Sequence, residues 1–128
     1  MNTVVAALIE HEEMVLACRR RSDQDHGGKW EFPGGKVEAG EELTAALARE
    51  LGEELQIQAE IGPEITRYEY AYPGKNPLLL VFYAVKSWTG DITSEQFSDA
   101  RWMPKSQLAS LDFLEGDVEF VASLAKGL

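Results

Sequence analysis

Apolar residues along the chain form several short runs and one longer periodic stretch. Thr3 to Glu10 and Met14 to Arg20 are short apolar runs on either side of a charged turn, which predicts two strands paired as a hairpin. From Glu41 to Leu55, apolar residues recur at spacings of three and four, which predicts an amphipathic helix. Shorter strands are expected at Trp30 to Phe32, Gln56 to Tyr72, Leu78 to Val85 and Ala100 to Met103.

Glycine and proline punctuate these elements. Pro33-Gly34-Gly35 is expected to break the strand before it and to form a glycine-rich turn directly ahead of the helix. Pro104 suits the first turn of a helical segment ending near Leu111, and Asp117 to Lys126 predicts a last helix. Strands before, around and after one central helix predict an α/β/α fold with helices on both faces of a mixed sheet, in a single domain of residues 1–128.

Composition narrows the classes of partner. The formal charge is −10, from 12 Lys plus Arg against 22 Asp plus Glu, and this charge argues against polymeric nucleic acid and anionic membranes as partners. Cys18 is the only cysteine, which excludes an intrachain disulfide and fits a reducing, cytoplasmic location. The apolar start is interrupted at Glu10 and has no basic leader, so we expect neither a signal peptide nor a membrane span.

Three glutamates of the predicted helix gather on one strip of its surface. At about 100° per residue, Glu50 and Glu54 project nearly together and Glu53 lies beside them. The plain alternative is a solvated acidic face, which is the usual meaning of such a run. Here Arg49 is spaced to pair with Glu53 one turn later, and a glycine pair lies upstream, so a binding site for divalent cations is the better hypothesis.

The stretch from Gly35 to Ile57 resembles the signature of the Nudix family. That signature is Gly, five free positions, Glu, seven free positions, then Arg-Glu-hydrophobic-free-Glu-Glu-free-Gly-hydrophobic. The matching residues are Gly35, Glu41, Arg49, Glu50, Leu51, Glu53, Glu54 and Ile57. Only the late glycine of the signature differs, since Gln56 stands in its place. This position suits a left-handed helix C-cap, for which glycine is the usual residue. The resemblance implies a Nudix-type α/β/α sandwich and a pyrophosphohydrolase.

The same resemblance implies a metal site and a set of catalytic carboxylates. Mg²⁺, with Mn²⁺ as the alternative, would be held by Glu50, Glu53, Glu54 and a backbone carbonyl at Gly34 or Gly35. Glu41 is either a supporting carboxylate of this site or simply a charge favourable near a helix N-terminus. Family members use a glutamate of the signature or a later loop glutamate as the general base. The later position, six residues before Trp102, holds Gln96 here, so the catalytic candidates are Glu50, Glu53, Glu54 and the adjacent Glu95.

Outside the signature, the resemblance extends over most of the chain and is nearest to MutT-like nucleotide-sanitising enzymes of the bacterial CTP pyrophosphohydrolase type. It rests on residues 15–20, 29–38 and 100–102. Arg20 matches a substrate-contacting arginine of the family, and Lys36 is a second candidate for substrate binding. Asp117 aligns with a residue that reads the base edge; the plain alternative is that Asp117 caps the last helix. An ionised Asp only accepts hydrogen bonds, which would favour an amino group or an extra N–H on the base.

The expected function is Mg²⁺-dependent hydrolysis of a canonical, modified or oxidised nucleoside triphosphate to the monophosphate and pyrophosphate, with cytosine nucleotides or 8-oxo-dGTP as candidate substrates. One alternative is hydrolysis of another nucleoside diphosphate linked to a further group. A second is a catalytically silent module that senses nucleotides. The expected partner is a small nucleotide, and the sequence leaves monomer and dimer open.

Overall fold

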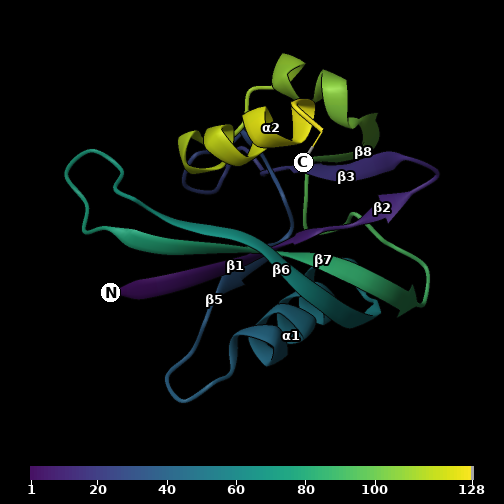
Figure 1. Cartoon of the computed structure of the whole chain (residues 1–128), viewed down its shortest axis with the longest axis horizontal. Helices are drawn as coiled ribbons and strands as arrows, with labels where there is room; N and C mark the ends of the chain where they lie inside the picture. The colour runs from purple at the N-terminus through teal and green to yellow at the C-terminus, as the bar shows by residue number, and fades with distance from the viewer. Residues whose placement is uncertain (128) are drawn as a thin grey trace. The chain divides into compact units, whose positions relative to one another are not determined.

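The computed structural model describes residues 1–127 of the 128-residue chain (Figure 1). These residues form two compact units, and each unit is assembled from two separate chain segments. The first unit takes Met1–Leu8 and Pro33–Thr93, and the second takes Ile9–Phe32 and the chain from Ser94 onward. Each unit has its own sheet.

The first unit contains a four-stranded mixed sheet with the order β5-β1-β7-β6. Strand β1 (Asn2–Leu8) pairs in parallel with β7 (Leu78–Thr89) and antiparallel with β5 (Gly34–Lys36). Strand β6 (Gln58–Tyr70) forms a long antiparallel hairpin with β7. The run from Val5 to Leu8 is wholly buried, as expected for a central strand that is covered on both faces.

Helix α1 (Leu43–Leu55) packs against β1, β5 and β6 of this sheet (Figure 1). Its apolar stripe, Ala46, Leu47, Leu51 and Leu55, is buried. The helix begins two residues later than its periodicity suggests, after Glu42 at the N-cap. It ends as predicted: Gln56 adopts the left-handed conformation (φ 64°, ψ 34°), and its N–H donates to the carbonyl of Gly52.

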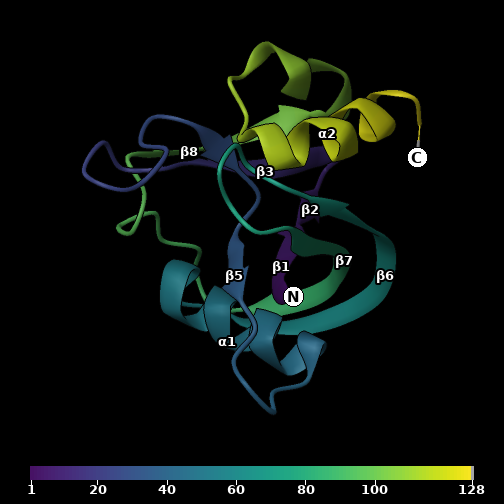
Figure 2. The same ribbon diagram turned by 90° about the vertical axis from the view of Figure 1, so that its left-hand side faces the viewer.

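The second unit has an antiparallel sheet centred on β3 (Met14–Arg19). Strand β3 pairs with β2 (Glu10–His11), β4 (Trp30–Glu31) and β8 (Asp99–Pro104). After β8 come two 3₁₀ helices, η1 (Lys105–Ser110) and η2 (Glu115–Asp117), and helix α2 (Val118–Ala125), which packs on both (Figure 2). The ring of Phe32 lies 5.1 Å from that of Phe113 and 5.3 Å from that of Phe120, so apolar contacts tie the end of β4 to α2.

The predicted α/β class and mixed sheet are confirmed, with three local corrections. The strands divide between two sheets, because only the short β2 forms the predicted hairpin with β3, whereas β1 pairs with β5 and β7. Gly34 and Gly35 lie in strand β5 rather than in a turn, since their backbone pairs with β1. Pro104 ends β8 and caps η1 instead of lying inside an α-helix.

Among the described residues, no helix combines the length and the apolar character that crossing a lipid bilayer requires.

Gly34 is predicted to be indispensable for folding of the first unit. A Cβ at this position would overlap the carbonyl oxygen of Val5 and lie 2.8 Å from Cα of Ala6, and neither backbone atom can move without breaking β1. We expect Gly34→Ala to lower the free energy of unfolding by about 3 kcal/mol or more, measured by urea denaturation. The control is Gly52→Ala in α1, where the nearest atom is 3.6 Å away and the better helix propensity of Ala should stabilise by up to about 1 kcal/mol. A wild-type midpoint for Gly34→Ala would contradict this packing.

Candidate active site

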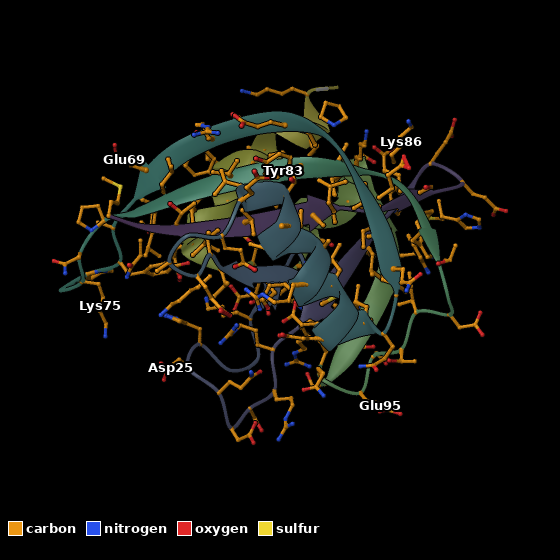
Figure 3. The ribbon with its side chains drawn as sticks, turned by 90° about the horizontal axis from the view of Figure 1, so that it is seen from below. Asp25, Glu69, Lys75, Tyr83, Lys86 and Glu95 are labelled. Carbon is orange, nitrogen blue, oxygen red and sulfur yellow. The ribbon has the colours of Figure 1, made fainter. Side chains whose placement is uncertain are left out.

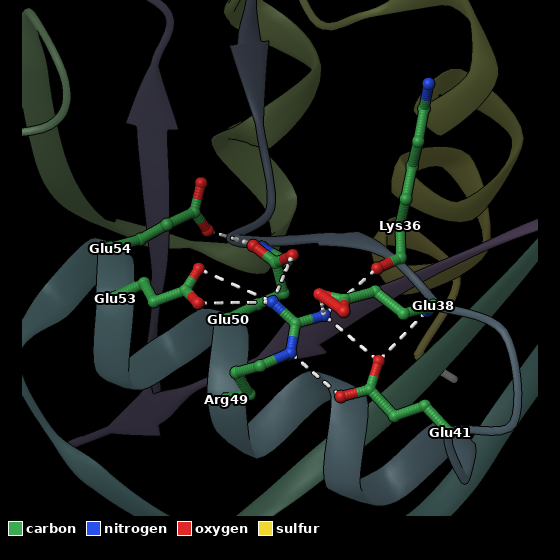
Figure 4. A network of polar contacts seen from close by, with 8 residues as sticks. Lys36, Glu38, Glu41, Arg49, Glu50, Glu53 and Glu54 are labelled. Carbon is green, nitrogen blue, oxygen red and sulfur yellow. Dashed lines mark hydrogen bonds and ion pairs between the residues drawn. The ribbon is translucent and has the colours of Figure 1, made fainter.

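Helix α1 brings Arg49 and the three predicted glutamates, Glu50, Glu53 and Glu54, to one side of the first unit (Figure 4). The helix also places them near β5, which it contacts and which carries Gly34, Gly35 and Lys36. The periodicity that buries Leu47 and Leu51 therefore also turns the carboxylates out of the core.

The guanidinium of Arg49 is the hub of this network (Figure 4). Its Nε and Nη2 donate to the two carboxylate oxygens of Glu41 at 2.8 and 3.0 Å, a bidentate pair. Its Nη1 donates to Glu50 at 3.1 Å and to Glu53 at 3.2 Å, and its Nη2 also reaches the carbonyl of Lys36 at 3.3 Å. One cation thus links the segment before the helix, the helix itself and strand β5.

The pKa values of two carboxyl groups respond to this arrangement in opposite directions. The hydrogen bond from Arg49, helped by the N–H of Glu38, lowers the pKa of Glu41 to about 2. Burial raises the pKa of Glu50, although Arg49 opposes the shift. Glu41 therefore behaves as the fixed counterion of Arg49, which favours the supporting role over that of a charge in the first helical turn.

The two glycines of β5 allow the helix carboxylates to come close to the strand. The N–H of Gly34 donates to Oε1 of Glu54 at 2.9 Å. A Cβ on Gly35 would lie 2.5 Å from the carboxylate carbon of Glu50, so only glycine leaves room for that carboxylate where it lies. Lys36, the next residue, is exposed, and its side chain extends away from the carboxylates (Figure 4).

These residues suit a hard divalent cation in chemistry, although they do not form a ready-made ligand set. Glu50, Glu53 and Glu54 supply the carboxylate oxygens that Mg²⁺ prefers. Within residues 1–127, however, no three His, Cys, Asp or Glu side chains form a group that could hold a metal ion. The reason is that Glu50 and Glu53 turn toward Arg49, while Glu54 turns toward Gly34.

The second unit holds Arg20, which is already engaged by its own surroundings. Its Nε donates to the carbonyl of Asp25 at 2.8 Å, and its Nη1 lies 3.2 Å from both carboxylate oxygens of Glu31. The side chains of Arg20 and Glu31 are only 22% and 15% exposed. The sequence did not lead us to predict a role for Glu31. The feature that could have indicated one is a charged residue between two aromatic residues, Trp30 and Phe32.

Asp117 is buried in the same unit, with 8% of its surface exposed. It stands at the N-cap position of α2, yet its side chain makes no capping hydrogen bond. Burial, and then the negative charge of Glu31, raise the pKa of Asp117 to about 7, whereas the backbone N–H of Phe32 donates to the carboxylate and opposes the shift. Asp117 therefore does not cap the last helix through its side chain, as the plain alternative held. It is instead a buried carboxyl group that the charge of Glu31 influences.

Glu95 lies in the loop between β7 and β8 and points outward from it (Figure 3). It belongs to the second unit and is exposed, as is its neighbour Gln96. The role of Glu95 as a base stays a prediction. Unlike Glu95, Glu50 is partly buried and pairs with Arg49.

Asp117 is expected to make stability depend on pH. Because its pKa in the folded chain, about 7, exceeds the ordinary value of 3.8, the stability that its protonated form contributes is complete below about pH 4 and is lost as the pH rises through about 7. The loss is at most about 4 kcal/mol. Asp117→Asn keeps the shape and cannot ionise, so urea denaturation should show the variant gaining on the wild type between about pH 4 and about pH 7. A difference that stays constant with pH would contradict a buried, protonated Asp117.

Comparison with known proteins supports the interpretation of the signature. The family model described as the NUDIX domain matches residues 1–124. The chain is 30% identical over 124 residues to the 8-oxo-dGTP diphosphatase of Escherichia coli K12, which covers 96% of this chain and 95% of that protein. It is 43% identical over 75 residues to the CTP pyrophosphohydrolase of the same organism. That alignment covers 59% of this chain and only 56% of that protein.

A solved structure agrees over nearly the whole chain. The solution structure of the E. coli ORF135 protein superposes with a TM-score of 0.87 at 29% identity, covering 98% of this chain and 89% of that one. Members of the family generally use divalent metal ions, which accords with the oxygen-rich side of α1. The chain belongs to the Nudix family and is a hydrolase of its nucleotide pyrophosphohydrolase class.

Proposed function

We propose that this protein hydrolyses a nucleoside triphosphate to the nucleoside monophosphate and pyrophosphate in a reaction that depends on Mg²⁺, with Mn²⁺ as a substitute. The observation that carries the proposal is the strip of Glu50, Glu53 and Glu54, ordered by Arg49 and by the glycines of β5. A binding module without catalysis would have no need of three hard-ligand carboxylates at this spacing.

Two roles are proposed for the residues of this site: holding the metal and accepting a proton. Glu50, Glu53 and Glu54, with a backbone carbonyl at Gly34 or Gly35, would hold the metal. When bound, such a metal neutralises the phosphate charge and lowers the pKa of a coordinated water. Glu50 is our first choice for the carboxylate that accepts a proton from the attacking water, because its raised pKa suits a base better than that of an ordinary exposed glutamate. Glu95 is the second choice.

Arg49 and Glu41 position the other carboxylates of the site before the reaction begins. The bidentate pair fixes the guanidinium, which then orients Glu50 and Glu53 and reduces the repulsion among the carboxylates. Lys36 is exposed, and we propose that its ammonium group contacts phosphate oxygens. Asp117 is proposed to read the base.

We propose a small nucleotide, canonical or with a modified or oxidised base, as the substrate. The relatives named for CTP and for 8-oxo-dGTP support cytosine nucleotides and 8-oxo-dGTP as the first candidates. Such a role would belong to nucleotide-pool sanitation and would protect DNA from damaged precursors. We also propose that residues 1–128 act as a single domain in the cytoplasm; the family match over residues 1–124 supports the single domain.

The test is hydrolysis of a panel of canonical, methylated and oxidised nucleoside triphosphates, with and without Mg²⁺, followed by chromatography of monophosphate and pyrophosphate. We expect Glu53→Gln to reduce kcat by at least about 100-fold, because one hard ligand is lost from the metal site. The matched control is Glu69→Gln, the same change at an exposed glutamate of β6, which should leave kcat unchanged.

Three results would contradict the proposal. Binding of nucleotides without cleavage would indicate a silent sensing module. Cleavage confined to nucleoside diphosphates linked to another group would redefine the substrate class. Equal activity of Glu53→Gln and Glu69→Gln would remove the α1 strip from the chemistry.

A further inference from the structure

Arg20, Glu31 and Asp117 are linked ionisable groups within the second unit: Arg20 and Glu31 form a part-buried ion pair, and the charge of Glu31 acts on the buried Asp117. Arg20 follows β3, Glu31 lies on β4, and Asp117 ends η2. Nη1 of Arg20 lies 3.2 Å from each carboxylate oxygen of Glu31, and Nε is taken by the carbonyl of Asp25. Two nitrogens of the guanidinium, Nε and Nη1, are thus occupied by protein acceptors. Arg20 is therefore better suited to positioning Glu31 than to binding phosphate.

The carboxyl groups of Glu31 and Asp117 are not equivalent. Burial raises the pKa of Glu31, but its counterion Arg20 opposes that shift. Asp117 is buried and accepts a hydrogen bond from the N–H of Phe32. Two nearby carboxyl groups in a poorly solvated place do not both ionise readily, and a single cation decides which one carries the charge. The cation is attached to Glu31, so the proton stays on Asp117.

We propose that Arg20 is a specificity-determining positioning residue: by pinning Glu31 as the ionised partner, it keeps Asp117 as a carboxylic acid that offers the base one donor and one acceptor. This inference rests on the proposed function, since it assumes that Asp117 reads the base. It changes the substrate preference expected from sequence, where an ionised Asp117 could only accept hydrogen bonds.

The protonation state of Asp117 then selects between base edges. A carboxylic acid pairs with an edge that carries an amino group beside a ring acceptor, as in cytosine (N4 and N3) and adenine (N6 and N1). An ionised carboxylate instead pairs with two adjacent donors, such as the N1–H and amino group of guanine. We therefore expect cytosine and adenine nucleotides to be favoured at acid to neutral pH, and guanine nucleotides to gain as the pH rises.

Other charged groups of this unit largely neutralise one another. Lys29 pairs with Asp112 at 2.9 Å and with Glu115 at 3.3 Å. His26 interacts electrostatically with Glu115. On the remaining elements, Lys105 of η1 pairs with Glu10, and Glu119 of α2 is exposed. Burial and Glu31 are the influences that favour protonation of Asp117, and Phe32 is the one that opposes it.

A direct test is to titrate the carboxyl carbon of Asp117 by ¹³C NMR in the metal-free, nucleotide-free protein, with Asp117→Asn identifying the signal. We expect a wild-type midpoint of about 7. Glu31→Gln removes the neighbouring charge, and Arg20→Gln lets Glu31 take up the shared proton, so both should lower the midpoint by about one unit or more. Arg20→Lys keeps a cation and should retain most of the wild-type behaviour.

The matched control is Arg21→Gln, the neighbouring arginine, which is exposed and pairs with Asp23. It should leave the Asp117 midpoint unchanged. An unchanged midpoint in Arg20→Gln, with a folded amide spectrum, would overturn the inference. Because this titration involves no hydrolysis, its outcome is independent of whether the proposed reaction occurs.

A kinetic measurement separates positioning from direct contact with phosphate. The ratio of kcat/KM for cytosine over guanine nucleotides should fall as the pH rises through about 7 in the wild type. In Arg20→Gln, that fall should move to lower pH by about one unit. If Arg20→Gln instead raised KM equally for every base at every pH, Arg20 would be a phosphate contact and the inference would fail.

Discussion

The guanidinium of Arg49 is the contact on which the acidic side of α1 depends. Three glutamates at this spacing repel one another, and the helix would gain nothing from them without a cation. Arg49 offers its Nη1 to Glu50 and Glu53 while Glu41 clamps its other edge. The result is that Glu50 and Glu53 are held beside the same guanidinium before any substrate arrives.

A second constraint operates in the other unit, where the fold buries charge instead of exposing it. Arg20 is the counterion of Glu31, and Asp117 is buried beside Glu31, so the surroundings of each group decide its protonation rather than its ordinary pKa. Burying an uncompensated carboxylate is costly, and holding Asp117 as an acid avoids that cost near neutral pH. The two units thus treat carboxylates in different ways: Arg49 contacts Glu41, Glu50 and Glu53 in one, and burial raises the pKa of Asp117 in the other.

Local sequence patterns predicted the features that local forces determine. The periodicity of α1, the left-handed Gln56 and the pairing of Arg49 with Glu53 all arise within one or two helical turns. The pairing of β1 with β7 instead joins distant segments, and alternation of side chains carries no information about partners. The approach of Asp117 to Glu31 was invisible for the same reason, and the glycines of β5 read as a turn because their strand pairing is also long-range.

The central claim is that the carboxylates beside Arg49 form a divalent metal site. The most direct measurement is the paramagnetic broadening of assigned amide signals as Mn²⁺ is added to the nucleotide-free protein. We predict that signals from Gly34 to Lys36 and from Glu50 to Glu54 broaden first, and that added Mg²⁺ restores them. Broadening that begins at another acidic segment, such as Glu10 to Glu13, or that is spread evenly over the acidic surface, would contradict the claim.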